Sequence, residues 1–199
     1  ITDGRTHDSL FQVENKYLLE VEAAKYRDIC SQYKYMREIR GDGNCFYRAL
    51  CFGHLESLLQ NDRALQRNSD TKWQSLAAGF DENSSKDFLY VLGQCEADEH
   101  GDKLLQLFNE QATFDSMVQY LRLLKSAYLQ NLADFFSHFV EAPSFKVYCT
   151  QEVETMAMEC DHVDILALSE ALGVSIHIRE LSPPCKTAHF DILYPHYCH

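Results

Sequence analysis

The spacing of apolar residues along the chain of 199 residues predicts a fold in which helices dominate. Helical spacing or a high content of helix formers occurs in residues 9–30, 44–59 and 114–140. The last of these patterns is interrupted near Asn131, which predicts a break in a long helix. The stretch "ECDHVDILALSEALG" predicts another helix, with Asp161 as its N-cap and Gly173 as its terminator.

Alternation of apolar and polar residues predicts three short strands. The alternating stretches are residues 33–39, 174–181 and 187–194. Residues 61–103 are polar and irregularly patterned, which is typical of short helices and loops. A helical majority with one small sheet indicates the α+β class, and the chain length suits one domain.

Composition and charge exclude several classes of protein. With 46% hydrophobic and 24% charged residues, the chain is typical of a folded globular domain. Its net charge is −12 and it has no long Lys/Arg cluster, so we expect no nucleic acid as main partner. No apolar run reaches the roughly 20 residues of a membrane span, so we expect no membrane contact.

The chain has 8 cysteines but no C-x-x-C pair, so it lacks zinc-ribbon and thioredoxin spacing. Most of the cysteines lie among apolar neighbours, as Cys149 does in "FKVYCTQEV". This pattern favours buried free thiols in a reducing compartment. Cys45 is different because of the residues that precede it.

The stretch "GDGNCFYRAL" places Cys45 directly after a permissive turn. Gly41 and Gly43 allow a sharp turn with inward N–H groups, and Asn44 is a good N-cap for a helix that begins around Cys45. A helix N-terminus can lower the pKa of a thiol from about 8.5, and the N–H groups of residues 42–45 are placed to hold an oxyanion. On this stretch alone, an ordinary glycine loop before a core cysteine explains the pattern equally well.

A nucleophilic cysteine needs a base and a group that orients the base, and "HFD" is the best candidate. Residues two apart in a strand share a face, so His189 and Asp191 are expected to lie side by side. H-x-D alone is a weak signal, but a cysteine presented by a turn makes it much stronger. His177 also lies in a predicted strand, yet its neighbour two residues on is Arg179, which cannot orient it.

His162, in "CDHVD", is expected at the start of a helix. We favour a histidine in the capping region, and the alternative is a contact with substrate near the site. The other histidines are expected to be solvated or packing residues: His7, His54, His100, His138, His196 and His199.

Several stretches together resemble the otubains, which are ovarian-tumour (OTU) domain deubiquitinating cysteine proteases. They are "GDGNCFYRAL", "HLESLL", "YLRLLKSAYL", "QEVETMAMECDHVDILALSEAL" and "HFDILY". The resemblance runs from about Tyr33 to Tyr194. It implies a papain-like α+β fold, with a small and mainly antiparallel sheet between helical lobes. It also implies hydrolysis of the isopeptide bond between ubiquitin and a lysine, without a metal or cofactor.

The resemblance also assigns roles to residues of this chain. Cys45 would be the nucleophile, His189 the general base and Asp191 its orienting group, with the oxyanion hole formed by Asp42 and the backbone N–H groups of Gly43, Asn44 and Cys45. Residues 1–32 would form an N-terminal helical arm that contacts a second ubiquitin or a conjugating enzyme, and residues 33–199 the catalytic domain. The preferred substrate would be a 48-linked ubiquitin chain.

One departure from the family pattern raises an alternative function. In relatives, a longer segment with extra strands separates the strand "VSIHIREL" from the catalytic histidine, whereas here only residues 182–188 join the two. The short link permits a turn between adjacent strands but removes surface that helps to grip ubiquitin. The alternative is therefore a largely non-catalytic regulator that binds ubiquitin and ubiquitin-conjugating enzymes. For either function we expect a monomer in the cytoplasm, with the nucleus as a second compartment.

Overall fold

The computed structural model describes residues 5–6, 27–59, 90–91, 93–95, 102–179 and 189–195. Of the helix predicted over residues 9–30, only the end is described, and residues 27–32 are helical. The short segment 182–188, most of the irregular segment 61–103 and most of the arm 1–32 lie outside the described residues.

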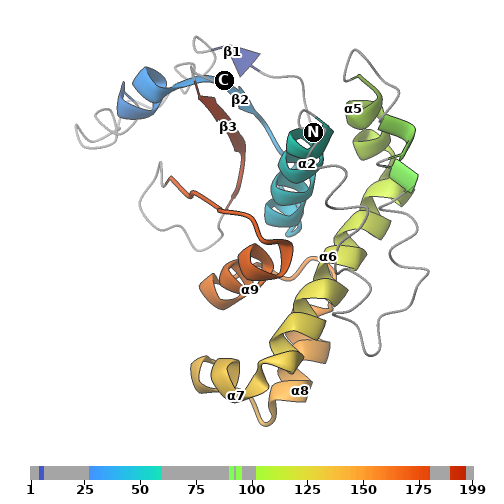
Figure 1. Ribbon diagram of the computed structural model, residues 1–199, viewed down its shortest axis with the longest axis vertical. Coiled ribbons are helices and arrows are strands. Elements are labelled where there is room, and N and C mark those ends of the chain that lie inside the picture. Colours follow the sequence, from blue (N-terminus) through green and yellow to red (C-terminus); the bar gives the residue numbers. More distant parts are fainter. Residues whose placement is uncertain are drawn as a thin grey trace.

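Three strands form a small antiparallel sheet in the order β1-β2-β3. The strands are β1 (Arg5–Thr6), β2 (Tyr33–Arg37) and β3 (Ile192–Pro195). Arg37, the last residue of β2, pairs with Ile192, the first residue of β3. The chain that leaves β2 therefore starts beside the chain that enters β3, although the two are far apart in sequence (Figure 1).

The helices from α2 onward lie on the other side of the sheet from the helical residues 27–32 (Figure 1). They are α2 (Cys45–Leu59), α5 (Asp102–Asn109), α6 (Gln111–Asn131), α7 (Ala133–Phe136), α8 (Phe145–Tyr148) and α9 (His162–Leu172). Figure 1 shows α2 between the sheet and α6, and α6 running from α5 to the end of the molecule where α7 and α8 lie. The turn of 3-10 helix Ser137–Phe139 follows α7, and the π-helical turn Cys149–Val153 follows α8.

The helix predictions are confirmed where the structure describes them. The pattern over 114–140 is broken at Leu132, next to the predicted Asn131, where α6 gives way to α7. Asp161 caps α9 in a reciprocal capping box with Asp164, and Gly173 ends the helix with a φ of 64°. Helix-terminal residues act locally, and so the sequence predicts them well.

The strand predicted over 174–181 is wrong, because residues 174–179 form no strand. Val174 and Ile176 are half-buried against the core, whereas Ile178 is 45% exposed. One side of an extended segment packs on the core here without a neighbouring strand in the described structure. This packing produces the same alternation as a strand, and β3 pairs with β2 instead.

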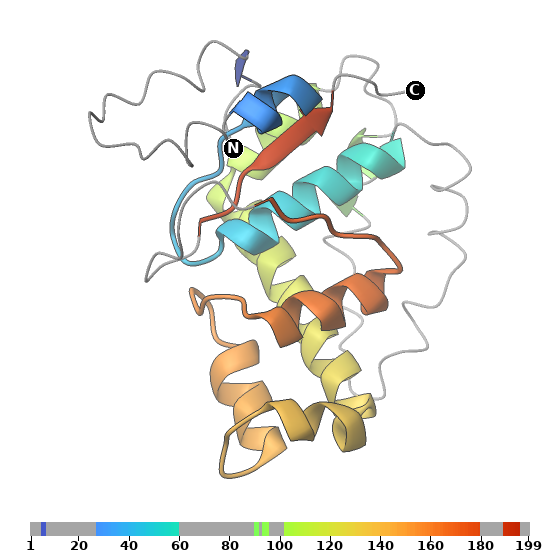
Figure 2. The same ribbon diagram turned by 90° about the vertical axis from the view of Figure 1, so that its left-hand side faces the viewer.

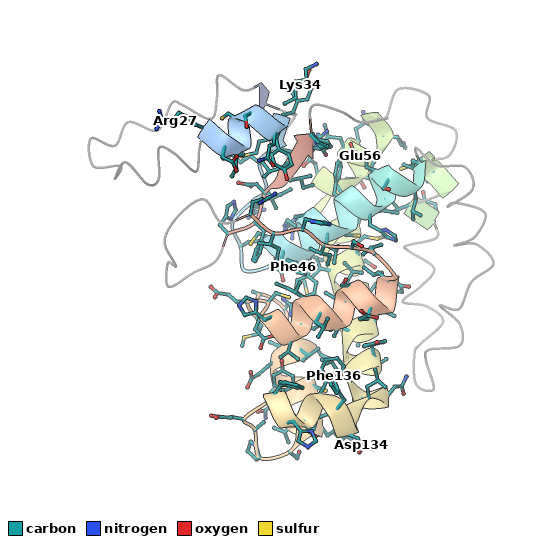
Figure 3. The ribbon with its side chains drawn as sticks, turned by 60° about the vertical axis from the view of Figure 1, so that its left-hand side comes forward. Arg27, Lys34, Phe46, Glu56, Asp134 and Phe136 are labelled. Atoms are coloured by element: carbon teal, nitrogen blue, oxygen red, sulfur yellow. The ribbon has the colours of Figure 1, made fainter. Side chains whose placement is uncertain are left out.

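Two apolar clusters stabilise the helices. The larger cluster joins α2, α5, α6 and α9 and includes Phe46, while the smaller one joins the end of α6 to α7 and α8 and includes Phe136. Figure 3 shows Phe46 near the sheet and Phe136 close to the far end of the molecule. The sheet and the start of α2 therefore rest on the larger cluster.

A buried ion pair connects α6 with α9. Lys125 is fully buried, and its Nζ lies 2.8 Å from Oδ1 of Asp164 and 2.5 Å from the hydroxyl oxygen of Tyr47. The Tyr148 hydroxyl donates to the same carboxylate oxygen over 3.3 Å. Four helices thus meet at one charged cluster, where a single unpaired group would be costly.

Asp164→Ala is expected to lower the free energy of unfolding by about 3–5 kcal/mol, because Lys125 would stay buried without its partner. The double variant Lys125→Met/Asp164→Leu should recover most of this loss, since it removes both charges and refills the space. Urea denaturation of the three proteins measures the difference. Equal losses in the single and the double variant would contradict the assignment.

Candidate active site

The pairing of β2 with β3 determines which predicted site residues meet. Beyond β2 the chain runs through Ile39 to the glycine turn, and Cys45 is the first residue of α2. The backbone N–H of Ile39 donates to Oδ1 of Asp191 over 2.8 Å. This hydrogen bond joins the two chain segments just beyond the paired ends of β2 and β3. It fixes Asp191 beside the segment that leads to Cys45.

His189 and Asp191 are in contact, as their spacing predicted. Nε2 of His189 lies 3.1 Å from Oδ1 of Asp191. Both residues precede β3, however, so a shared strand face is not the reason for the contact. Asp191 is half-buried and fixed by Ile39, whereas the His189 side chain is 44% exposed. The carboxylate can therefore orient the imidazole ring.

The ring of His189 faces the glycine turn. Because Nε2 faces Asp191, Nδ1 is the nitrogen left for a reacting group, and a Cβ on Gly41 would lie 3.5 Å from it. The neighbouring residue, Phe190, hydrogen bonds through its backbone to the thiol of Cys45, and its ring lies 5.2 Å from that of Phe46. The structure thus brings the predicted base segment to the predicted nucleophile.

Burial dominates the electrostatics of Cys45. The residue is only 6% exposed, and this desolvation raises the pKa of its thiol. Backbone hydrogen bonds from Phe190 and Phe46 act in the opposite direction, and the carboxylate of Asp42 adds to the rise. Burial therefore opposes the lowering of the Cys45 pKa that was expected from the helix N-terminus.

Asp42 stabilises the turn as a carboxylate. Burial alone would raise its pKa, but hydrogen bonds from Arg48 and Asn44, with the positive charges of Arg48 and Arg40, hold the pKa of Asp42 below its usual value. Nη2 of Arg48 lies 2.5 Å from Oδ2 of Asp42, and the N–H of Asn44 donates to Oδ1 over 3.1 Å. The Asn44 N–H is therefore directed at Asp42, which corrects its predicted place in the oxyanion hole.

Asn44 occupies the N-cap position of α2, but its side chain does not cap the helix. Its carbonyl accepts from the Arg48 N–H over 3.0 Å, as an N-cap carbonyl should. Its Oδ1 instead accepts from Nη2 of Arg122 over 2.9 Å and from the N–H of Ala157 over 3.0 Å. The sequence analysis missed Arg122, although a charged residue within the apolar stripe of a helix was an available signal.

Gly43 is required by its conformation and by its neighbour. Its φ is 75°, and a Cβ there would lie 2.4 Å from the carbonyl oxygen of Ala157. Ala157 itself has a φ of 62°, which is uncommon for a residue with a side chain. The turn before Cys45 and the segment around Ala157 are thus packed backbone against backbone.

His162 is the exposed first residue of α9, next to the N-cap Asp161, which agrees with the favoured interpretation. Contact with a substrate stays a prediction. Of the predicted free thiols that are described, Cys30, Cys51, Cys95 and Cys149 are buried and Cys160 is half-buried.

In the described part of the chain, no group of three or more His, Cys, Asp and Glu residues is arranged to hold a metal ion. No helix in the same residues combines the length and apolar character that a membrane crossing needs.

The chain is similar to known proteins over most of its length. A family model described as Peptidase C65 Otubain matches residues 6–193. Ubiquitin thioesterase OTUB2 of Mus musculus is 40% identical over 199 residues, which covers 85% of this chain and 85% of that protein. Ubiquitin thioesterase OTUB1 of Homo sapiens is 44% identical over 164 residues, which covers 78% of this chain and 60% of that protein.

The fold is also similar to solved structures. A complex described as h/ceOTUB1-ubiquitin aldehyde-UBC13~Ub has a TM-score of 0.79 and 25% identity, and the match covers 95% of this chain and 79% of that one. This similarity confirms the predicted α+β OTU fold. It agrees with the helix-rich architecture and the small antiparallel sheet described above.

Alkylation of Cys45 by iodoacetamide is expected to rise with pH through a midpoint above the ordinary thiol value of about 8.5, because burial raises its pKa and only the thiolate reacts. Mass spectrometry of the Cys45 peptide over a pH series measures this. The chain unfolded in urea provides the reference midpoint. A rate that already reaches its plateau below neutral pH would instead indicate a preformed thiolate–imidazolium pair.

Gly43→Ala is expected to lower the free energy of unfolding by at least about 1–2 kcal/mol, because the new Cβ meets the Ala157 carbonyl at a positive φ. Gly53→Ala is the matched control, since a Cβ there meets nothing within 4 Å and the residue lies inside α2. The control should gain about 0.5–1 kcal/mol. Similar shifts of both variants in denaturant titrations would argue against the close packing at Gly43.

Proposed function

Because the chain belongs to the peptidase C65 otubain family, we propose that it hydrolyses isopeptide bonds of ubiquitin through Cys45, His189 and Asp191. One observation carries this proposal. The contact of 3.1 Å between His189 and Asp191 lies next to the residue, Phe190, whose backbone hydrogen bonds to the Cys45 thiol. The relatives named above as ubiquitin thioesterases support ubiquitin as the substrate.

The first step is attack on the carbonyl of the ubiquitin C-terminus. Since the Cys45 thiol is protonated in the free chain, its proton has to move to Nδ1 of His189 as the Sγ–C bond forms. The π pair of the carbonyl moves onto oxygen and creates the oxyanion. Asp191, held by Ile39, keeps Nε2 protonated and stabilises the imidazolium.

The oxyanion would be held by backbone N–H groups of the turn. We propose those of Asp42, Gly43 and Cys45, while the Asn44 N–H keeps Asp42 in place. The carboxylate of Asp42 would by itself repel a nearby negative charge. Arg48 compensates for this charge through its ion pair, so the turn can accept an anion.

The remaining steps return the site to its starting state. The tetrahedral intermediate collapses, the C–N bond breaks, and the lysine nitrogen takes the proton from the His189 imidazolium. A water molecule then gives its proton to His189 while its oxygen attacks the thioester carbonyl. The Sγ–C bond breaks, and the released thiolate takes the proton back. The net reaction consumes one water and yields a carboxylic acid and an amine, which become a carboxylate and an ammonium by transfer of one proton.

A second candidate function is the binding of ubiquitin and a ubiquitin-conjugating enzyme without efficient cleavage. The similar solved complex that contains ubiquitin aldehyde and UBC13~Ub favours these partners. The buried, protonated thiol of the free chain fits a site that is inactive until a partner binds.

We further propose that residues 1–32 form the arm for a second ubiquitin and that His162 contacts substrate. We also propose that the protein is a monomer in the cytoplasm or nucleus.

The first experiment compares cleavage of 48-linked and 63-linked diubiquitin by the wild type and by Cys45→Ala. We expect cleavage of the 48-linked chain alone and its complete loss in Cys45→Ala, because that variant lacks the nucleophile. Cleavage by Cys45→Ala would overturn the assignment of the nucleophile. Binding without cleavage by the wild type, with inhibition of ubiquitin transfer by both proteins, would favour the regulator.

A further inference from the structure

Arg122 of α6 is a fully buried cation that pairs with no described carboxylate. Lys125, one turn further along the same helix, forms an ion pair with the nearby Asp164. Nε of Arg122 has no hydrogen-bond partner among the described residues. A buried guanidinium in such surroundings is costly, and an apolar side chain would fill the same space without this cost.

The guanidinium instead joins two backbone segments at the candidate site. Nη2 donates to Oδ1 of Asn44 over 2.9 Å and to the carbonyl of Met158 over 2.8 Å, and Nη1 donates to the carbonyl of Val153 over 3.1 Å. The plane of the group lies over the ring of Tyr47, 4.2 Å from its centroid. A planar fork with several donors fixes the direction of each of these bonds.

The segment held by Arg122 also contacts the turn directly. The N–H of Ala157 donates to the same Asn44 oxygen over 3.0 Å, and the Ala157 carbonyl leaves no room for a side chain at Gly43. In Figure 2 this segment, in light orange, lies below the start of α2. Asn44 immediately precedes Cys45, so the guanidinium contacts the turn at a different residue from the Asp42–Arg48 ion pair.

We propose that Arg122 is a positioning residue that, through Asn44, holds the turn of residues 42–45 in the geometry that binds an oxyanion. Arg122 does not touch the reacting atoms. Its importance for catalysis rests on the proposed function, but its effect on the turn does not. The effect of Arg122 on the turn should appear in any reaction of Cys45 that creates an oxygen anion or a hemithioacetal. It should be absent from reactions of Cys45 that create neither.

Two reactions of Cys45 separate this role from simple support of the fold. Iodoacetamide alkylates the thiolate with loss of iodide, and no oxyanion forms. Acetyl-glycyl-glycinal adds reversibly, since the Sγ–C bond forms, the carbonyl pair moves to oxygen, and oxygen takes the thiol proton. Protection of Cys45 by this aldehyde against iodoacetamide therefore measures the oxyanion site without ubiquitin.

The experiment compares Arg122→Met with the wild type at fixed pH. Lys125→Met is the matched control, because it also removes a fully buried cation from α6. The Lys125 side chain makes no hydrogen bond to Asn44. Arg122→Met should weaken protection by the aldehyde about 10- to 100-fold and change the alkylation rate by less than about twofold. Lys125→Met should lower the melting temperature but leave the ratio of protection to alkylation unchanged.

Other outcomes overturn the proposal. The first is unchanged aldehyde protection of Cys45 in a folded Arg122→Met protein. The second is a loss of protection in Lys125→Met that equals the loss in Arg122→Met. The third is an alkylation rate of Arg122→Met that falls as much as its protection does. If Arg122→Met fails to fold, Asn44→Ala removes the shared acceptor with a smaller loss of packing and must give the same pattern.

Activity on a ubiquitin substrate separates this inference from the proposed function. With an active wild type, Arg122→Met should lower kcat about as much as protection and leave KM within about twofold, since it acts on the reacting geometry. An inactive wild type would overturn the proposed function, and the aldehyde measurement would still decide the role of Arg122.

Discussion

β2 and β3 pair antiparallel, so the residues that follow one strand lie beside the residues that precede the other. Each group of the candidate site is attached to this pairing by a short piece of chain. Ile39 extends it through its bond to Asp191, His189 lies just before β3, and the glycine turn lies just after Ile39. The pairing closes a loop of most of the chain, and this closure has an entropic cost that the apolar clusters must repay. The site can therefore exist only when the helical part of the molecule has folded.

Charged groups around the site each have a separate partner. Asp42 pairs with Arg48 and Lys125 with Asp164, while Arg122 binds backbone carbonyls and the amide of Asn44. This separation matters because a buried charge is tolerated only when its donors and acceptors are used. The turn before Cys45 is consequently held by the ion pair between Asp42 and Arg48 of α2 and by the hydrogen bond from Arg122 of α6 to Asn44.

The sequence predicted those features that depend on neighbouring residues. The glycine turn, the start of α2 at Cys45 and the N-cap at Asp161 all follow from local chemistry. The contact of His189 with Asp191 was predicted from spacing, although the geometry that produces it differs from a strand. The raised pKa of Cys45 and the role of Arg122 could not be predicted, because both arise from packing between distant segments. Segment 174–179 shows that alternation of apolar and polar residues indicates one buried side of the chain. It does not indicate that the segment pairs with another strand.

The contrast between a buried candidate nucleophile and an exposed candidate base has a consequence for redox chemistry. Oxidation of a cysteine to a sulfenic acid requires a thiolate that an oxidant can reach. Cys45 is 6% exposed and its pKa is raised by burial, whereas the His189 side chain is 44% exposed. We therefore expect Cys45 to react slowly with peroxide in the resting protein. In the proposed mechanism, Cys45 becomes vulnerable to oxidants during turnover, when its thiolate forms.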